Sequence, residues 1–106
     1  SIGDNTLISA GAIINALSVI ETGCIINTGA IVEHDCTIKA FAHIAPGAVI
    51  AGNVTVGNRS FVGAGSVVKQ GVRIGNDVII GAGAVVIKDV SDNQIVAGNP
   101  AKPLNK

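Results

Sequence analysis

The sequence predicts an all-β fold, a parallel β-solenoid of about five triangular coils, on the basis of three observations. Ile or Val occupies every sixth position from Ile2 to Val86, without a slip or an insertion. The fourth residue after each of these positions is small or β-branched, from Thr6 to Val90. No amphipathic segment is long enough to form the crossover helices that the parallel sheet of an α/β protein needs.

A period of six fits neither a helix, which needs 3.6, nor a strand, which needs 2. It fits an extended chain that bends at a fixed interval, so that three repeats close one triangular turn of 18 residues. The branched residue then points into the prism, and Gly, Asn and Asp suit the sharp bends. Successive turns pair roughly 4.8 Å apart, so residues 18 positions apart lie one above the other.

The composition of the 106-residue chain indicates a single soluble domain. Seven basic and seven acidic residues give no net charge, which argues against a nucleic-acid or membrane surface. No apolar run approaches the roughly 18 residues of a membrane span and no signal peptide opens the chain, so we expect a cytoplasmic protein. Cys24 and Cys36 occupy inward positions on different walls, where we expect free thiols that act as small hydrophobes.

Residues 1–25 are expected to form the first coil and a third of the next. Ile2 is already a core position, and the end of a solenoid needs a cover. We therefore expect either a preceding segment of a longer enzyme or partner chains to cover this end.

The stretch 26–53 contains both histidines of the chain. His34 falls at a corner, so its ring points out of the prism, and Glu33 and Asp35 on either side could orient it. One turn later the chain places Gly52, whose missing Cβ allows a ligand to approach the backbone closely. An exposed imidazole beside an accessible N–H is a minimal acyl-transfer site, a base with an oxyanion donor.

His43 follows His34 by half a turn and therefore lies on another side of the prism. The two rings can share a site only when another copy packs alongside, which predicts a homo-oligomer with sites between subunits. Asn27, seven residues before His34, is a candidate to hold the ring of His34.

Residues 54–86 stack small residues at intervals of 18, Ala64 below Ala82 and Gly65 below Gly83. Such a smooth strip has two readings. It can be a set of tight corners, or it can be the floor of a groove for an elongated ligand that binds backbone amides.

Residues 87–106 break the repeat, and the segment IVAGNPAKPL (Ile95–Leu104) contains two prolines and a Gly-Asn pair. We expect the solenoid domain to span 1–88. The tail, 89–106, should cap the last coil or cross to a neighbour.

The pattern Ile/Val-Gly-x-x-small-x, as in IGNDVI (Ile74–Ile79) and IGAGAV (Ile80–Val85), resembles the hexapeptide-repeat acyltransferases, and this resemblance implies a left-handed β-helix. The tail AGNPAKP resembles the C-terminal signature of the acetyl-CoA-dependent members. The order INT, EHDC, AHIAPGA, AGNV, GAGSVV and GNPAKP is similar to one group in particular. This is the group of sialic-acid O-acetyltransferases and bacterial nucleotide-sugar N-acetyltransferases.

The resemblance to this group implies a role for each matching residue. His34 is the general base, tuned by Asp35, with Asn27 also at the site. His43 contacts the acetyl end of acetyl-CoA, and the N–H of Gly52 binds the thioester oxygen. These enzymes are homotrimers with CoA between subunits, and the residues expected on CoA are Ala64, Ala82 and Lys102. The resemblance covers nearly all of the present chain, and full-length members also carry an N-terminal α/β domain for the nucleotide of the acceptor.

The implied reaction is transfer of acetyl from acetyl-CoA to the amine of a nucleotide-linked amino sugar, with no metal. An imidazole is mostly unprotonated at pH 7, as a base must be. O-acetylation of sialic acid or another sugar and a non-catalytic trimeric scaffold remain alternatives. A γ-type carbonic anhydrase needs three zinc-binding histidines, and the chain has two. An ice-binding face needs long stacked Thr rows, and only Thr37 and Thr55 stack.

Overall fold

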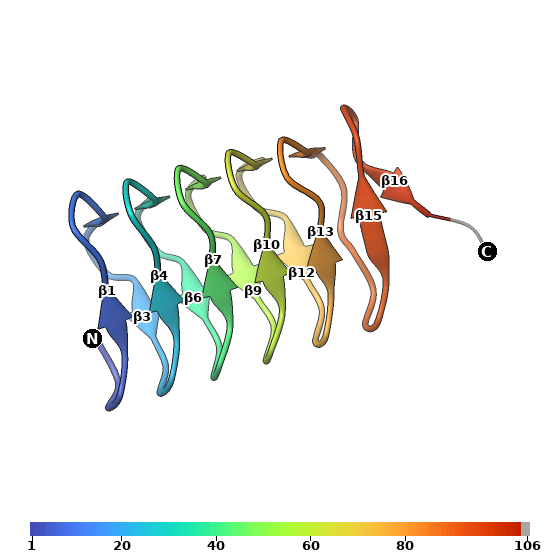
Figure 1. The fold of residues 1–106 in the computed structure, drawn as a ribbon. Coiled ribbons are helices and arrows are strands. Elements are labelled where there is room, and N and C mark those ends of the chain that lie inside the picture. Colours follow the sequence, from blue (N-terminus) through green and yellow to red (C-terminus); the bar gives the residue numbers. More distant parts are fainter. Residues whose placement is uncertain (105–106) are drawn as a thin grey trace.

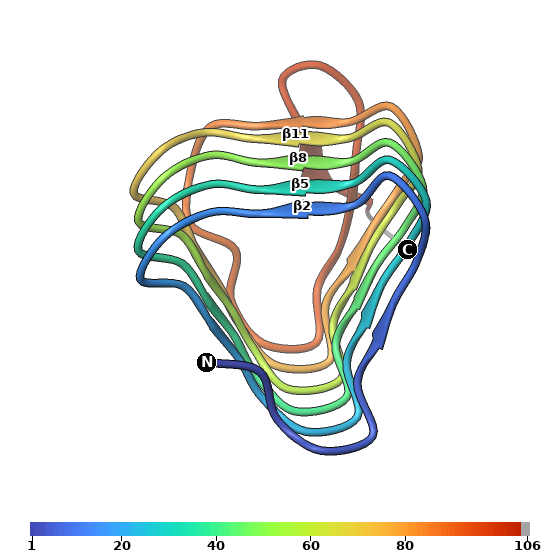
Figure 2. The same cartoon turned by 90° about the vertical axis from the view of Figure 1, so that its left-hand side faces the viewer.

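The computed structural model describes residues 1–104, which form sixteen short strands and no helix (Figure 1). The chain winds through triangular coils stacked along one axis, and Figure 2 shows the three walls of the prism. The fold is a parallel β-solenoid, as the period predicts, of the left-handed, hexapeptide-repeat type that the family resemblance implies. None of the described residues forms a helix that could cross a membrane.

The strands form three sheets, one on each wall. The first face contains β1 (Leu7–Ile8), β4 (Ile25–Ile26), β7 (His43–Ile44), β10 (Phe61–Val62), β13 (Ile79–Ile80), β15 (Ile95–Ala97) and β16 (Lys102–Pro103). The second face contains β2 (Ile13–Ile14), β5 (Ile31–Val32), β8 (Val49–Ile50), β11 (Val67–Val68) and β14 (Val85–Val86). The third face contains β3 (Val19–Ile20), β6 (Thr37–Ile38), β9 (Thr55–Val56) and β12 (Arg73–Ile74).

The parallel strands pair in the predicted register of 18 residues, as in the pairs His43–Phe61 and Val49–Val67. The core is the inward row of Ile and Val. Every sixth residue from Ile20 to Val86 is at most 2% exposed. Each such side chain contributes about 1.5–3 kcal/mol by leaving water.

The first coil departs from this pattern, because only one coil lies against it among the described residues. Ile2 and Ile8 are 55% and 36% exposed, and Ile14 is half-buried. At this end the side chains therefore point inward, as predicted, but they are not buried within the single chain.

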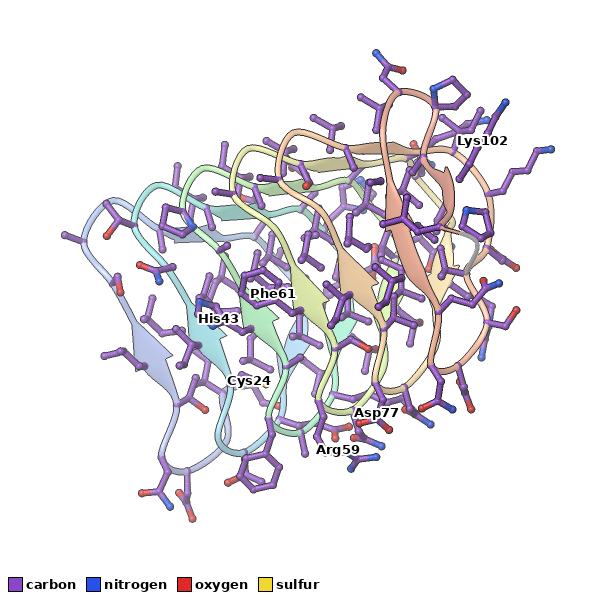
Figure 3. The ribbon with its side chains drawn as sticks, turned by 45° about the vertical axis from the view of Figure 1, so that its right-hand side comes forward. Cys24, His43, Arg59, Phe61, Asp77 and Lys102 are labelled. Carbon is purple, nitrogen blue, oxygen red and sulfur yellow. The ribbon has the colours of Figure 1, made fainter. Side chains whose placement is uncertain are left out.

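Each corner holds one residue per coil at positive φ. Between the first and second faces this residue is always glycine, and we call this edge the glycine corner (Gly11, Gly29, Gly47, Gly65 and Gly83). Between the second and third faces lies the histidine corner, with Leu17, Asp35, Asn53 and Gly71 in this conformation. The arginine corner, between the third and first faces, holds Asn5, Gly23, Phe41, Arg59 and Asp77. There the guanidinium of Arg59 donates two hydrogen bonds to the carboxylate of Asp77, at 2.8 and 2.9 Å (Figure 3).

The tail closes the far end of the prism. β15 adds to β13 in parallel, and β16 turns back antiparallel to β15. The N–H of Ala101 donates to the carbonyl of Val85 at 2.8 Å, which ties the tail to the last full coil. Residues 105–106 of the expected tail lie outside the described residues.

Candidate active site

His34 lies on the histidine corner, with 59% of its side chain exposed. Its Nδ1 is 3.1 Å from the Oδ2 of Asp35. Because a carboxylate only accepts, Nδ1 carries the proton and Nε2 keeps a free lone pair. Asp35 therefore orients the imidazole, and it does so from a left-handed backbone conformation (φ 59°) that Asp tolerates better than most residues.

Glu33, the other acidic neighbour, does not contact the ring within the chain. Its Oε1 accepts a hydrogen bond from the amide of Asn15, one coil away, at 2.9 Å. Of the two acidic residues that the sequence offers for orienting His34, only Asp35 binds it.

Gly52 lies directly against the imidazole of His34. A Cβ on Gly52 would come within 2.8 Å of both Cε1 and Nε2, closer than side chains pack. Glycine is therefore required for the ring to occupy this place. The N–H of Gly52 has no acceptor among residues 1–104, although its neighbours Ala51 and Asn53 donate to the adjacent coils. An imidazole ring and a backbone N–H without an acceptor thus meet at one corner, as the 18-residue spacing predicts.

Asn27 does not contact His34 in the chain, so its expected contact with that ring is not formed here. The reason is geometric, since Asn27 belongs to the glycine corner and His34 to the histidine corner. Instead, Nδ2 of Asn27 is 3.2 Å from Nε2 of His43, on the neighbouring strand β7. The ring of Phe61 packs edge-on against His43, with centroids 5.0 Å apart (Figure 3). Adding 18 to the position of His43 gives Phe61, a signal that the sequence interpretation missed.

Ala64 and Ala82 lie one above the other on the glycine corner, and both are exposed. Neither N–H has an acceptor among the described residues. A Cβ on Gly65 or Gly83 would meet nothing within 4 Å, so crowding does not explain these glycines. Phe41 on the arginine corner adopts nearly the same φ, so a side chain is tolerated in this conformation at the expense of backbone strain. The result is an open edge with free amides, suited to close approach by a ligand.

Lys102, on β16, lies at the far end of the prism from His43 (Figure 3). With Lys88, Gln94 and Pro100 it lines a cleft of about 390 Å³ between the tail and the last coil. Lys102 therefore lies farther toward the C-terminal end of the prism than the N–H groups of Ala64 and Ala82, on the side away from the two histidines.

Both cysteines are buried, free and outside this site. Burial raises the pKa of each thiol. Cys36 donates from its sulfur to the carbonyl of Ala51, and Cys24 to that of Lys39. Neutral, buried thiols are poor nucleophiles, so neither is suited to form an acyl intermediate. Residues 1–104 contain no group of three or more His, Cys, Asp or Glu side chains placed to hold a metal ion.

The single chain therefore divides the expected site into two parts. His34, Asp35 and Gly52 meet on the histidine corner. Asn27, His43 and the two alanines lie along the glycine corner and the strand that leads into it.

Among solved structures, the acetyltransferase domain of PglB from Neisseria gonorrhoeae FA1090 is 43% identical, with a TM-score of 0.89. That match covers 98% of this chain and 54% of the other. A second structure of the domain is in complex with acetyl coenzyme A and is 45% identical. A variant of GDP-perosamine N-acetyl transferase from Caulobacter crescentus, in complex with CoA and GDP-perosamine, is 41% identical, with a TM-score of 0.91. It covers 99% of this chain and 53% of its own.

The chain thus spans about half the length of the solved structures that it matches. The comparison with curated proteins gave no match. The family model for the bacterial transferase hexapeptide (six repeats) matches residues 35–70 and 53–88, which together span just over half of the chain. This match confirms the resemblance that the repeat and the motifs indicate: the chain belongs to the bacterial hexapeptide transferase family.

Proposed function

We propose that this chain is the catalytic part of an acetyl-CoA-dependent acetyltransferase whose acceptor is the amine of a nucleotide-linked amino sugar. The observation that carries the proposal is the contact between the imidazole of His34 and Gly52, a residue with a free N–H. The similar proteins that hold acetyl coenzyme A, or CoA with GDP-perosamine, support the donor and the acceptor class.

In the proposed reaction the acceptor nitrogen attacks the thioester carbonyl carbon, and Nε2 of His34 takes the proton that the nitrogen loses. The N–H of Gly52 donates to the oxyanion that forms, a contribution of about 3 kcal/mol in comparable acyl transfers. The C–S bond then breaks, and the imidazolium returns a proton to the departing CoA sulfur. Asp35 stabilises the imidazolium between these two steps.

The donor site that we propose is the glycine corner. The free N–H groups of Ala64 and Ala82 are one coil apart, and an extended chain with amide and carbonyl groups can bind both. Pro46 precedes Ala64 in the same row and has no N–H, so Ala64 carries the first free N–H of this row on the C-terminal side of His43. We therefore place the acetyl end near His43 and the nucleotide end toward Lys102 and the tail.

A second copy of the chain completes the site in this proposal. Apart from His43 and Lys102, the outward side chains of the first and second faces are apolar, and Leu7, Ile13, Phe61, Val67 and Ile79 are 37–56% exposed. The third face instead presents Thr37, Thr55 and Arg73. The two apolar faces meet at the glycine corner, and in this proposal both face neighbouring subunits, with the glycine corner of one subunit and the histidine corner of another on either side of a shared site. A homotrimer with CoA between subunits satisfies this arrangement. A cytoplasmic location remains a prediction.

A panel of acceptors tests the reaction class. We would measure acetyl-CoA-dependent thiol release with nucleotide-linked amino sugars, free amino sugars and sialic acid, and identify the products by mass spectrometry. N-acetylation of an amino sugar supports the proposal, whereas exclusive O-acetylation would move the chain to the alternative class. A chain that fails to bind acetyl-CoA would be a scaffold.

Subunit mixing tests whether the site is shared. His34→Ala and His43→Ala chains are each expected to be nearly inactive. When they are unfolded together at equal amounts and refolded, about one quarter of the sites in a ring with heterologous interfaces should regain both histidines. Recovery of activity toward that level supports a site between subunits. No recovery, with trimers formed, would place the whole site within one chain.

A further inference from the structure

His43 is a polar side chain on an apolar strip of the first face. Its neighbours in register are Ile25 on β4 and Phe61 on β10. The ring is half-buried, and the edge-on contact with Phe61, at an interplanar angle of 80°, restricts its plane. A ring fixed in this way can present only one of its nitrogens outward.

The amide of Asn27 has a defined orientation. Its Oδ1 accepts the N–H of Thr28 at 2.7 Å, which leaves Nδ2 on the side of His43. An amide nitrogen only donates hydrogen bonds, and this one is 3.2 Å from Nε2 of His43. Nε2 must therefore be the unprotonated nitrogen, and the ring hydrogen of neutral His43 must be on Nδ1. A protonated ring, or one with hydrogen on Nε2, would set two donors against each other.

We propose that Asn27 is a positioning residue that holds His43 as the neutral Nδ1–H tautomer, so that the ring presents one N–H donor to the ligand. Nδ1 of His43 has no acceptor among residues 1–104, which leaves its hydrogen available. A neutral donor is also far less costly than a charged one to bury on an apolar subunit surface. The identity of the ligand oxygen that accepts this hydrogen rests on the proposed function, whereas the assignment of the tautomer does not.

The tautomer can be read directly by long-range ¹H–¹⁵N correlation spectra of the full chain labelled in histidine. The chain has only two histidines, so a His34→Asn sample assigns both rings. The informative variant is Asn27→Asp. A carboxylate still accepts the N–H of Thr28, so the turn is kept, but its other oxygen now accepts where Nδ2 donated. Asn76→Asp is the control, since Asn76 also accepts a backbone N–H through its side-chain oxygen, that of Asn58 on the adjacent coil, and lies on the arginine corner away from His43.

At pH 7.5 we expect His43 to carry its hydrogen on Nδ1 in the wild type and in Asn76→Asp. In Asn27→Asp the hydrogen should move to Nε2, and the affinity for acetyl-CoA should fall roughly tenfold with loss of one donor. A wild-type ring with hydrogen on Nε2, or an Asn27→Asp spectrum that does not change, would overturn the inference.

Addition of acetyl-CoA separates this inference from the proposed function. We expect it to shift the Nδ1 resonance of His43 in the wild type. A tautomer that switches as described, in a chain whose spectrum acetyl-CoA does not alter, would uphold the role of Asn27 and contradict the proposed donor.

Discussion

The most informative substitution is Gly52→Ala, because the structure predicts little change in stability and a large loss of activity. The added Cβ would come within 2.8 Å of Cε1 and Nε2 of His34 and 3.4 Å of Cδ2. These atoms are the end of a side chain that is 59% exposed, so the ring can rotate into solvent. Gly52 is not among the residues at positive φ, so alanine is not strained there. We expect the free energy of unfolding to change by less than about 1 kcal/mol.

Activity should respond much more strongly than stability. The imidazole must move by several tenths of an ångström or more, and a misplacement of about 1 Å can reduce a rate about 10²-fold. We therefore expect kcat/KM for acetyl transfer to fall roughly 100-fold, measured by thiol release, while acetyl-CoA still binds.

Gly71→Ala on the same corner is the matched control. Gly71 has φ +81°, and a Cβ there would meet nothing within 4 Å. Alanine at this position should cost about 1–2 kcal/mol of stability through backbone strain, with kcat unchanged. If Gly52→Ala retains activity within threefold of the wild type, the contact between the ring and this glycine is not the catalytic feature that we describe.

Three further predictions follow from the fold. Gly65→Leu should weaken acetyl-CoA binding at least tenfold in calorimetry, while backbone strain costs only about 1–2 kcal/mol of stability. Unchanged affinity would exclude the glycine corner as the donor site. Ile44→Ala, at 0% exposure, should destabilise the chain by about 2–5 kcal/mol in urea unfolding, and Ile2→Ala, at 55% exposure, by far less; equal losses would contradict the core assignment. The hydrogen bonds from Arg59 lower the pKa of Asp77, so their contribution to stability is present above the ordinary aspartate pKa of about 3.9 and is lost as pH falls through the lowered value. Arg59→Ala should flatten stability between neutral pH and this region, and an unchanged pH profile would argue against the pair.

The coils of this protein could be predicted from sequence because their geometry follows directly from the six-residue repeat. A period of six that never slips determines which residues point inward and which pairs stack. The approach of His34 to Gly52 followed from adding 18, and the structure places two ring atoms within 2.8 Å of the position that a Cβ of Gly52 would take. The stacking of Ala64 and Ala82 followed in the same way.

The 18-residue spacing does not predict contacts between side chains that belong to different stacked rows. Asn27 and His43 are 16 residues apart, so their contact depends on how two side chains lean across neighbouring coils, not on the repeat. Asn15 and Glu33 are 18 residues apart, so the repeat does stack them, but whether the carboxylate of Glu33 binds Asn15 or His34 depends on rotamers. The exposure of Ile2 has a different cause, because the burial of a coil depends on what covers it, and the six-residue period does not predict the cover.

The central claim is that His34 removes a proton in an acetyl transfer from acetyl-CoA. Its most direct test compares wild type and His34→Ala in thiol release with the best nucleotide-linked amino sugar, beside calorimetry of acetyl-CoA binding. We predict a fall in kcat of about 10²–10⁴-fold with the affinity for acetyl-CoA unchanged. A His34→Ala chain that turns over at the wild-type rate would contradict the assignment of the base and the account built on it.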